Sequence, residues 1–143
     1  MSTIVIIPCG GRKIEGKAKA SELYIGSYFK VNLRYARSIA KDEDIFILSA
    51  LYGFLPLNKR VETYDLRMGR PSTEIIDKTR KQADKLGILN KKAVILGGKN
   101  YVDCCRDCFK TPYVLTEHLE LKGMGYQMQW ATRNIGLNPF KRK

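Results

Sequence analysis

The sequence has one histidine, one tryptophan and no apolar run near the roughly 20 residues that a membrane-spanning helix needs. Its start passes from Ser2 and Thr3 directly into the short apolar run 4–7, without the basic region and longer apolar stretch of a secretory signal peptide. These features predict a soluble, cytoplasmic protein with no membrane partner. Because the residues around His118 are typical of a surface loop, we expect no histidine-dependent catalytic site.

Cysteines are few, and their spacing argues against a metal site. Cys105 and Cys108 form a C-x-x-C pair, but no second pair completes a tetrahedral zinc site. Cys104 and Cys105 are adjacent, so on a helix they point to different sides. We therefore expect buried thiols on a helix, no metal, no cofactor and, in a reducing compartment, no disulfide.

Acidic side chains are also scarce, with 14 Asp and Glu against 26 Lys and Arg, for a net charge of +12. Such an excess predicts a positive field that attracts nucleic acid, with DNA favoured, or a nucleotide, although many basic proteins are merely soluble. The excess is uneven: segment 66–110 holds 11 basic and 5 acidic side chains, whereas 42–65 holds 2 and 5. We look for chemistry in this acidic segment.

The length of 143 residues and a hydrophobic fraction of 44% suit one domain with its own core. Short β-branched runs predict buried strands, and apolar residues at helical spacing predict helices between them. The strands are expected at 3–8, 44–48, 92–96 and 112–115, and the helices at 28–40, 72–86, 100–109 and 125–134. This alternation predicts an α/β fold with a small, mostly parallel sheet flanked by helices. The tail 137–143 is expected to be flexible.

Three polar loops follow predicted strands, so a parallel sheet would bring them to one rim, where ligands of such sheets bind. In the first loop, Gly10 and Gly11 leave backbone N–H groups free between Cys9 and the cations Arg12 and Lys13. This combination suits a phosphate or the edge of a base, although it has no P-loop spacing. The alternative is a tight turn with solvated charges.

The second loop contains Ser49, Tyr52 and Gly53, and the pair Tyr64-Asp65 follows it. We predict that Ser49, Tyr64 and Asp65 are catalytic, with the carboxylate positioning a water or stabilising a sugar cation during glycosidic cleavage. Tyr52 and Tyr64 would sandwich a base. In the alternative interpretation, Asp65 caps a turn or pairs with Arg67, and the tyrosines lie at the edge of the core.

Two later segments complete the predicted binding residues. Gly98 and Lys99 form a possible phosphate contact, although two glycines before a helix are common in any fold. Lys122, Gly123 and Gln127 are candidates for phosphate or base contacts, and a packing role for this glycine-rich stretch fits equally well.

Several of these motifs together resemble a small phage and bacterial family of unassigned function. They are Cys9-Gly10-Gly11-Arg12-Lys13, Ser21-Glu22-Leu23-Tyr24, the run 47–53, Tyr64-Asp65-Leu66 and the run 121–125. That family is similar to the YaaA proteins of the peroxide-stress response and to the central domain of archaeosine synthase. The resemblance implies a three-layer fold akin to the uracil-DNA glycosylase superfamily, although the water-activating motif of those glycosylases is missing here.

The resemblance also implies a role on DNA or on modified nucleosides. The sequence-based hypothesis is therefore a protein that binds nucleic acid or a nucleotide and processes its base, by N-glycosidic bond chemistry, at the carboxyl rim of the sheet. One alternative is a YaaA-like protein that binds DNA without catalysis. Another is a phage protein that sequesters a nucleotide or inhibits a host factor.

Overall fold

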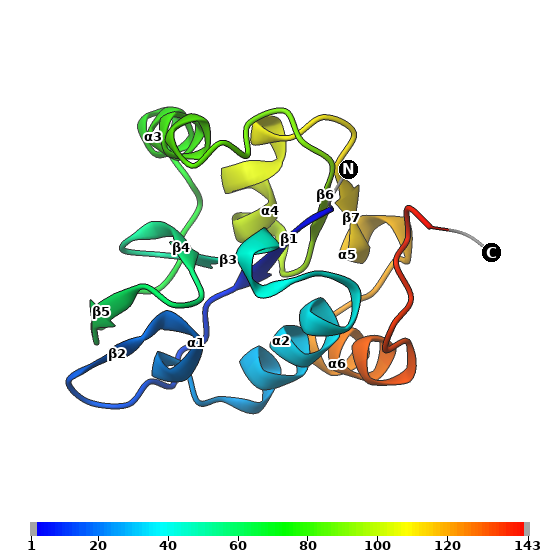
Figure 1. Ribbon diagram of the computed structural model, residues 1–143, viewed down its shortest axis with the longest axis horizontal. Helices are drawn as coiled ribbons and strands as arrows, with labels where there is room; N and C mark the ends of the chain where they lie inside the picture. The colour runs from blue at the N-terminus through cyan, green and yellow to red at the C-terminus, as the bar shows by residue number, and fades with distance from the viewer. Residues whose placement is uncertain (1–2, 142–143) are drawn as a thin grey trace.

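The computed structural model describes residues 3–141 and contains a five-stranded sheet between two layers of helices (Figure 1). The strands are β1 (Ile4–Pro8), β3 (Ile45–Ser49), β4 (Gly53–Pro56), β6 (Ala93–Ile95) and β7 (Tyr113–Val114), in the spatial order β4-β3-β1-β6-β7. All neighbours pair in parallel except β4, which runs antiparallel to β3 at one edge. The predicted α/β class with a mostly parallel sheet is thus confirmed.

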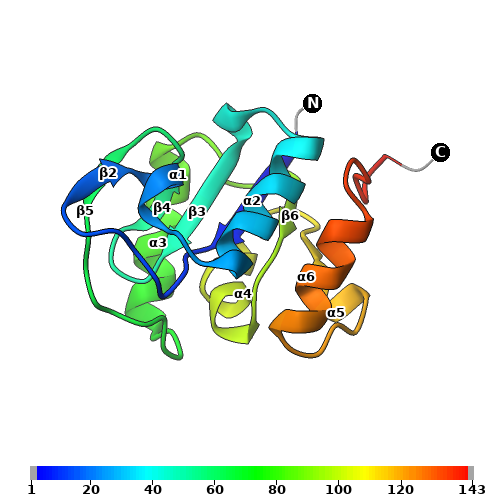
Figure 2. The same cartoon turned by 90° about the horizontal axis from the view of Figure 1, so that it is seen from below.

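Helices cover both faces of the sheet. On one face, α2 (Ser27–Ile39) and α6 (Met124–Arg133) lie side by side (Figure 2). On the other face lie α3 (Thr73–Lys85) and α4 (Lys99–Cys105), which is followed by the 3-10 turn η2 (Arg106–Cys108). The predicted helix 100–109 corresponds to α4 and η2 together.

The edge strand β4 was not predicted from the sequence, and neither were the remaining elements, which are all short. They are β2 (Lys17–Lys19), α1 (Ala20–Leu23), η1 (Asp42–Asp44), β5 (Arg60–Glu62) and α5 (Leu115–His118). The strands β2 and β5 pair with each other in a separate antiparallel ribbon. This ribbon lies beside the β4 edge of the main sheet (Figure 1).

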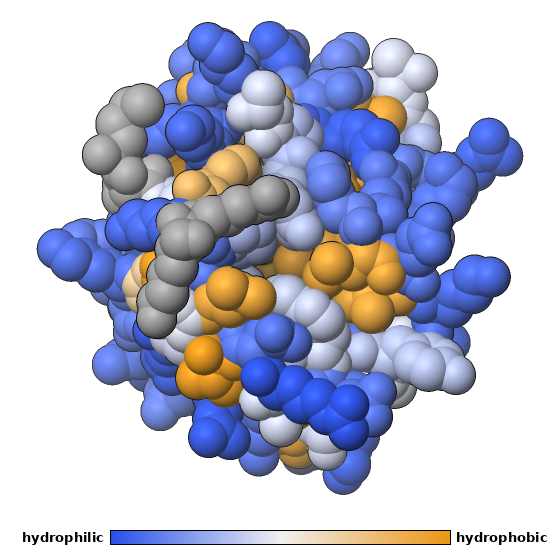
Figure 3. All heavy atoms as spheres, turned by 90° about the vertical axis from the view of Figure 1, so that its right-hand side faces the viewer, coloured by the Kyte–Doolittle hydropathy of each residue, from blue (hydrophilic) through white to orange (hydrophobic). Residues whose placement is uncertain are grey.

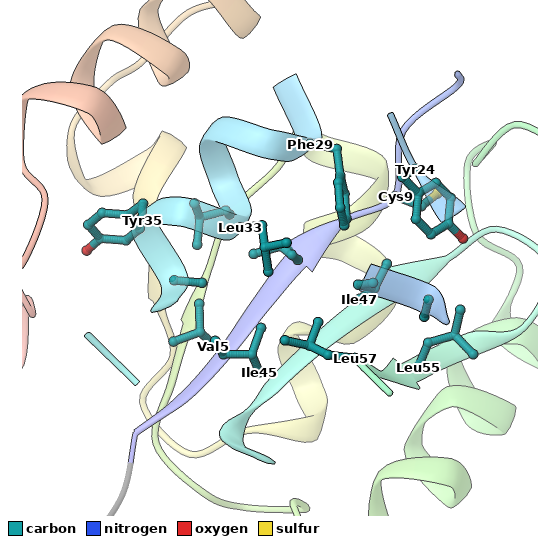
Figure 4. Packing of buried hydrophobic residues seen from close by; sticks show 14 of the residues in the cluster. Val5, Cys9, Tyr24, Phe29, Leu33, Tyr35, Ile45, Ile47, Leu55 and Leu57 are labelled. Atoms are coloured by element: carbon teal, nitrogen blue, oxygen red, sulfur yellow. The ribbon is translucent and has the colours of Figure 1, made fainter. Parts of the chain in front are cut away.

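The strands are apolar on both faces because both faces are covered. In β1, Val5 and Ile7 belong to the core under α2, whereas Ile4 and Ile6 belong to the core under α3 and α4. All four side chains are almost fully buried. Figure 4 shows the first of these cores, with Cys9 and Tyr24 together at one end and Tyr35 at the other.

The order of the strands creates a topological change at the carboxyl ends of β1 and β6. The chain leaves β1 toward α2 on one face, and it leaves β6 toward α4 on the opposite face. Neighbouring parallel strands whose helices part in this way form a topological switch point, where ligands of open α/β sheets bind. Two of the predicted loops, 9–13 and 97–101, follow these two strands.

Local signals set several element boundaries. Ser72 precedes α3 as predicted, and its Oγ accepts a hydrogen bond from the Ile75 N–H at 3.2 Å.

A long-range contact attaches the segment after α6 to α2. The Tyr35 hydroxyl donates to the Leu137 carbonyl at 2.7 Å, and Asn138 is buried. Residues 142–143 of the predicted flexible tail lie outside the described residues.

The face shown in Figure 3 is mostly hydrophilic, with separated apolar patches. Within residues 3–141, no helix combines the length and the hydrophobicity that crossing a membrane requires.

Candidate functional site

A cluster of three hydroxyl groups lies where β3 ends. The Tyr64 Oη is 2.7 Å from the Ser49 Oγ and 2.7 Å from the Tyr24 Oη. Ser49 is the last residue of β3, Tyr24 directly follows α1, and Tyr64 lies two residues beyond β5. We call Tyr24, Ser49 and Tyr64 the hydroxyl cluster. It joins three segments that are distant in the sequence.

Counting protons gives the direction of one hydrogen bond in this cluster. The Ser49 Oγ accepts from the Leu51 N–H at 3.1 Å and from the Tyr52 N–H at 3.0 Å, which uses both of its lone pairs. The Ser49 hydroxyl must therefore donate to Tyr64. Only one of the two phenol protons of Tyr24 and Tyr64 can lie in the bond between them. The other proton has no acceptor among the described residues and is available to a ligand or water.

Burial keeps these phenols protonated. Desolvation raises the pKa of Tyr24 to about 12, against the opposing effect of its hydrogen bond to Tyr64. Desolvation also raises the pKa of Tyr64 well above its ordinary value, and the nearby Cys9 thiol adds to the effect. At neutral pH the cluster is therefore a hydrogen-bond donor.

Lys13 brings a positive charge to the hydroxyl cluster. Its Nζ lies 4.4 Å from the ring centroid of Tyr64 and 5.8 Å from that of Tyr24, within the range of cation–π interaction. The same ammonium donates to the Gly11 carbonyl at 3.3 Å. Since an ammonium has three donors, Lys13 retains capacity for an anionic or carbonyl oxygen.

Tyr52 packs directly against Tyr64, with ring centroids 5.4 Å apart and an interplanar angle of 88°. The Tyr52 hydroxyl donates to the Glu62 carbonyl at 3.0 Å. Rings in edge-to-face contact leave no room for a base between them, so the prediction that Tyr52 and Tyr64 sandwich a base is wrong. An edge-to-face pair is favourable in itself, which explains the arrangement.

Cys9 and Tyr101 meet at the switch point between β1 and β6. The Tyr101 hydroxyl lies 3.3 Å from the Cys9 Sγ and 3.4 Å from the Cys9 carbonyl oxygen. Burial, followed by the proximity of the Cys9 thiol, raises the pKa of Tyr101 well above its ordinary value. This contact holds the first turns of α4 against the end of β1.

The glycine loop after β1 has free backbone donors. Within the described part of the chain, the N–H groups of Gly10 and Gly11 have no hydrogen-bond acceptor. Gly11 and Arg12 are exposed, and Lys13 is half-buried. The contacts described above join Cys9, Lys13, Ser49, Tyr52 and Tyr64 in one polar rim, as predicted. The glycine loop can add N–H donors to this rim.

A cleft of about 790 Å³ adjoins this rim on the α3 side. Its lining begins at Ser49 and Tyr52 and continues along α3 and along segment 66–71. It includes five basic side chains and no acidic one: Arg67, Arg70, Lys78, Lys81 and Lys85. Apolar side chains complete it: Leu51, Leu66, Met68 and Ile75. Its volume lies within the range of small-molecule sites.

In the sequence, Asp65 lies between a residue of the hydroxyl cluster and a residue that lines the cleft. It follows Tyr64 of the cluster and precedes Leu66 of the cleft. Its side chain is exposed, and it forms no hydrogen bond or ion pair with any described residue. It does not pair with Arg67, and its catalytic role remains a prediction.

Within the described residues, the other predicted binding residues form no hydrogen bond with the cluster. Lys99 pairs with Asp103 at 2.8 Å on the surface of α4, and Gly98 precedes that helix. Lys122 and Gly123 are exposed before α6. Gln127 is buried, and its Oε1 accepts a hydrogen bond from Tyr28, which favours a packing role.

The cysteines after β6 are buried, as predicted. Cys104 and Cys105 lie on α4 and Cys108 on η2, and burial raises the pKa of all three, that of Cys108 to about 11. His118 is half of a stacked pair with Tyr113, and its Nδ1 lies 2.9 Å from the Val114 carbonyl. These contacts are structural.

Sequence analysis missed Tyr24, Tyr101 and the basic lining of the cleft. Tyr24 occurs in the quoted run 21–24, but only the fold brings its hydroxyl to Tyr64. The lysines had a readable signal, because Lys78, Lys81 and Lys85 recur at helical spacing within a basic segment.

Comparison with known proteins identifies the family. Residues 4–133 match the model of a family of unknown function, DUF6884. The chain belongs to this family. No curated protein and no solved structure matches it. A relation of DUF6884 to YaaA, to archaeosine synthase or to the uracil-DNA glycosylase superfamily therefore remains a prediction.

Proposed function

We propose that this DUF6884 protein binds a nucleotide, or a nucleotide unit of nucleic acid, at the carboxyl rim and in the adjoining cleft. The observation that carries the proposal is the lining of the cleft, which has five cations, no carboxylate and several exposed apolar side chains. Cations neutralise phosphates, and apolar surface accommodates a base. The cleft also begins at Ser49 and Tyr52, so a ligand there reaches the edge of the hydroxyl cluster.

We further propose that the bound unit undergoes hydrolysis of its N-glycosidic bond. Water adds to the anomeric carbon of the sugar, the bond to the base breaks, and the base leaves with a proton. Asp65 would orient the water or stabilise the positive charge that develops on the sugar. The spare phenol proton of the hydroxyl cluster would donate to an oxygen or nitrogen of the departing base, and Arg12 and Lys13 would hold a phosphate.

The test measures free base released from single- and double-stranded oligonucleotides that carry normal or modified bases, read by mass spectrometry. With a substrate that is turned over, Asp65→Asn is expected to lower the rate by about 100-fold or more, as for loss of a general base. Asp77→Asn, another exposed carboxylate, is the matched control. Full base release by Asp65→Asn would overturn the role of Asp65.

The exposure of Asp65 favours one alternative, binding without turnover. A carboxylate that contacts no other described side chain is solvated and not held in place for catalysis. If the same oligonucleotides bind and no base is released from any of them, the protein is a non-catalytic nucleic-acid-binding protein.

A further inference from the structure

The basic side chains of the cleft come from two segments of the chain. Lys78, Lys81 and Lys85 occupy successive turns on one face of α3, and Arg67 and Arg70 on segment 66–71 line the same cleft. At about 1.5 Å rise per residue, Lys78 and Lys85 lie about 10 Å apart along the helix axis. A single phosphate group would engage only part of this length.

Acidic side chains of α3 lie outside the cleft. Glu74, Asp77 and Asp84 occur on the same helix, yet none of them lines the cavity. Arg80 also points elsewhere, because its guanidinium donates to the Asp107 carbonyl at 2.7 Å. The positive face of α3 is therefore confined to the cleft.

The same cleft also has exposed apolar surface. Leu51, Leu66 and Ile75 are each about half exposed, at 50%, 49% and 48%, and all three line the cleft. An inorganic anion would make no favourable contact with these apolar side chains. The occupant that matches both features carries flat apolar groups as well as a row of negative charges.

Resting on the proposed function, we propose that the cleft binds a single-stranded segment of nucleic acid. Its backbone lies between the α3 lysines and the two arginines, and its bases lie against Leu66 and Ile75. A stacked strand rises roughly 3.4 Å along its axis per nucleotide, so 10 Å of helix corresponds to about three phosphates. A duplex keeps its bases paired between two backbones, so it cannot present them to the apolar surface.

The test is fluorescence anisotropy with a labelled ten-residue oligothymidylate, in competition with a duplex of the same length and with thymidine monophosphate. We expect the single strand to bind at least tenfold more tightly than either competitor. Its log affinity should fall with log salt concentration at about −0.7 per phosphate contact, which gives a slope near −2 for three contacts.

Matched variants locate the binding. The double variant Lys78→Gln/Lys81→Gln should weaken binding at least tenfold and reduce the salt slope by about 1.4. The control Lys41→Gln/Lys91→Gln removes two exposed lysines that precede β3 and β6, at the amino ends of the strands and away from the carboxyl rim. It should change neither value. Ile75→Ser should weaken binding and leave the slope unchanged, because it removes apolar contact alone.

Equal loss in both double variants, or tighter binding of the duplex, would overturn the inference. Equal affinities for the monophosphate and the single strand would overturn it and leave nucleotide binding intact. Single-strand binding in the cleft without any base release would support it and contradict the proposed hydrolysis.

Discussion

At the residue scale, the hydroxyl cluster depends on the hydrogen-bonding capacity of one serine. Because Ser49 Oγ accepts two backbone N–H groups in the turn after β3, its own proton is committed to Tyr64. One of the two phenol protons then lies in the hydrogen bond between Tyr64 and Tyr24, and the other stays free for a ligand or water. The sequence-based analysis placed Ser49 and Tyr64 at the site for their polarity, but the donor character of the cluster follows only from these distances.

The buried phenols predict a loss of stability in alkali. Burial raises the pKa of Tyr24 and of Tyr28 to about 12, whereas an unfolded tyrosine titrates near 10. The folded state therefore holds these protons more tightly. Their contribution to stability is complete below pH 10 and is lost as the pH rises to 12, at about 1.4 kcal/mol per unit of pKa difference.

Urea denaturation at pH 9, 10, 11 and 12 measures this effect, and the phenolate absorbance of the folded protein reports the titration. The variant Tyr24→Phe is expected to lose less stability over the same pH range than the unmodified protein. Parallel losses in the two proteins would show that other groups cause the pH dependence.

At the element scale, Gln82 connects helix α3 to the edge strand β4. Its Oε1 accepts from the Phe54 N–H at 2.7 Å, and its Nε2 donates to the Tyr52 and Phe54 carbonyls at 3.1 and 3.2 Å. An edge strand exposes unpaired backbone groups, which a covering side chain can satisfy. This connection also holds one wall of the cleft against the strand that begins at Gly53.

A double-mutant cycle tests this connection. Gly53 has a φ of +71°, and a Cβ there would lie 2.3 Å from the Gln82 Oε1. Gly53→Ala and Gln82→Ala should each destabilise the protein by about 1–3 kcal/mol, the first through strain and loss of the Gln82 bonds, the second through those bonds alone. The double variant should lose less unfolding free energy than the sum of the two single losses, because both substitutions remove the same hydrogen bonds.

Chemical denaturation of the three variants gives the coupling energy. Gln129→Ala, an exposed glutamine on α6, is the control and should leave stability within about 0.5 kcal/mol. Additive effects of Gly53→Ala and Gln82→Ala would contradict a shared hydrogen-bond network.

At the scale of the whole molecule, two cores enclose the sheet, and all four cysteines belong to them. Cys9 lies in the core under α2, and Cys104, Cys105 and Cys108 lie in the core under α3 and α4. Exposure of their thiols therefore reports the opening of both layers. Burial also raises the pKa of Cys105 well above its ordinary value, which disfavours its reactive thiolate.

Thiol labelling tests the integrity of both cores. We expect Ellman's reagent to react slowly with the folded protein and rapidly with four thiols per chain in denaturant. The labelling rate should follow the population of open states as urea is added. Rapid reaction of one or more thiols in the folded protein would show that a core is accessible on its own.

The sequence alone was sufficient to predict the larger elements of this protein. Runs such as 4–7 are apolar and β-branched because both faces of their strands are buried. Ser72, the N-cap residue of α3, directly precedes that helix. These signals are local. The short strands β2 and β5 carry one buried residue each, and their pairing of Lys17 with Glu62 joins segments 45 residues apart, so no local pattern marks them.

The candidate site divides in the same way. Alternating strands and helices predicted that the loops at Cys9 and Ser49 would meet at one rim, because parallel strands end at the same edge. Only the tertiary structure placed Tyr24 and Tyr101 there, turned Tyr52 edge-on to Tyr64, and opened a basic cleft along α3. Side-chain packing and hydrogen-bond geometry decide these features, since they depend on distances between segments that the sequence order does not contain.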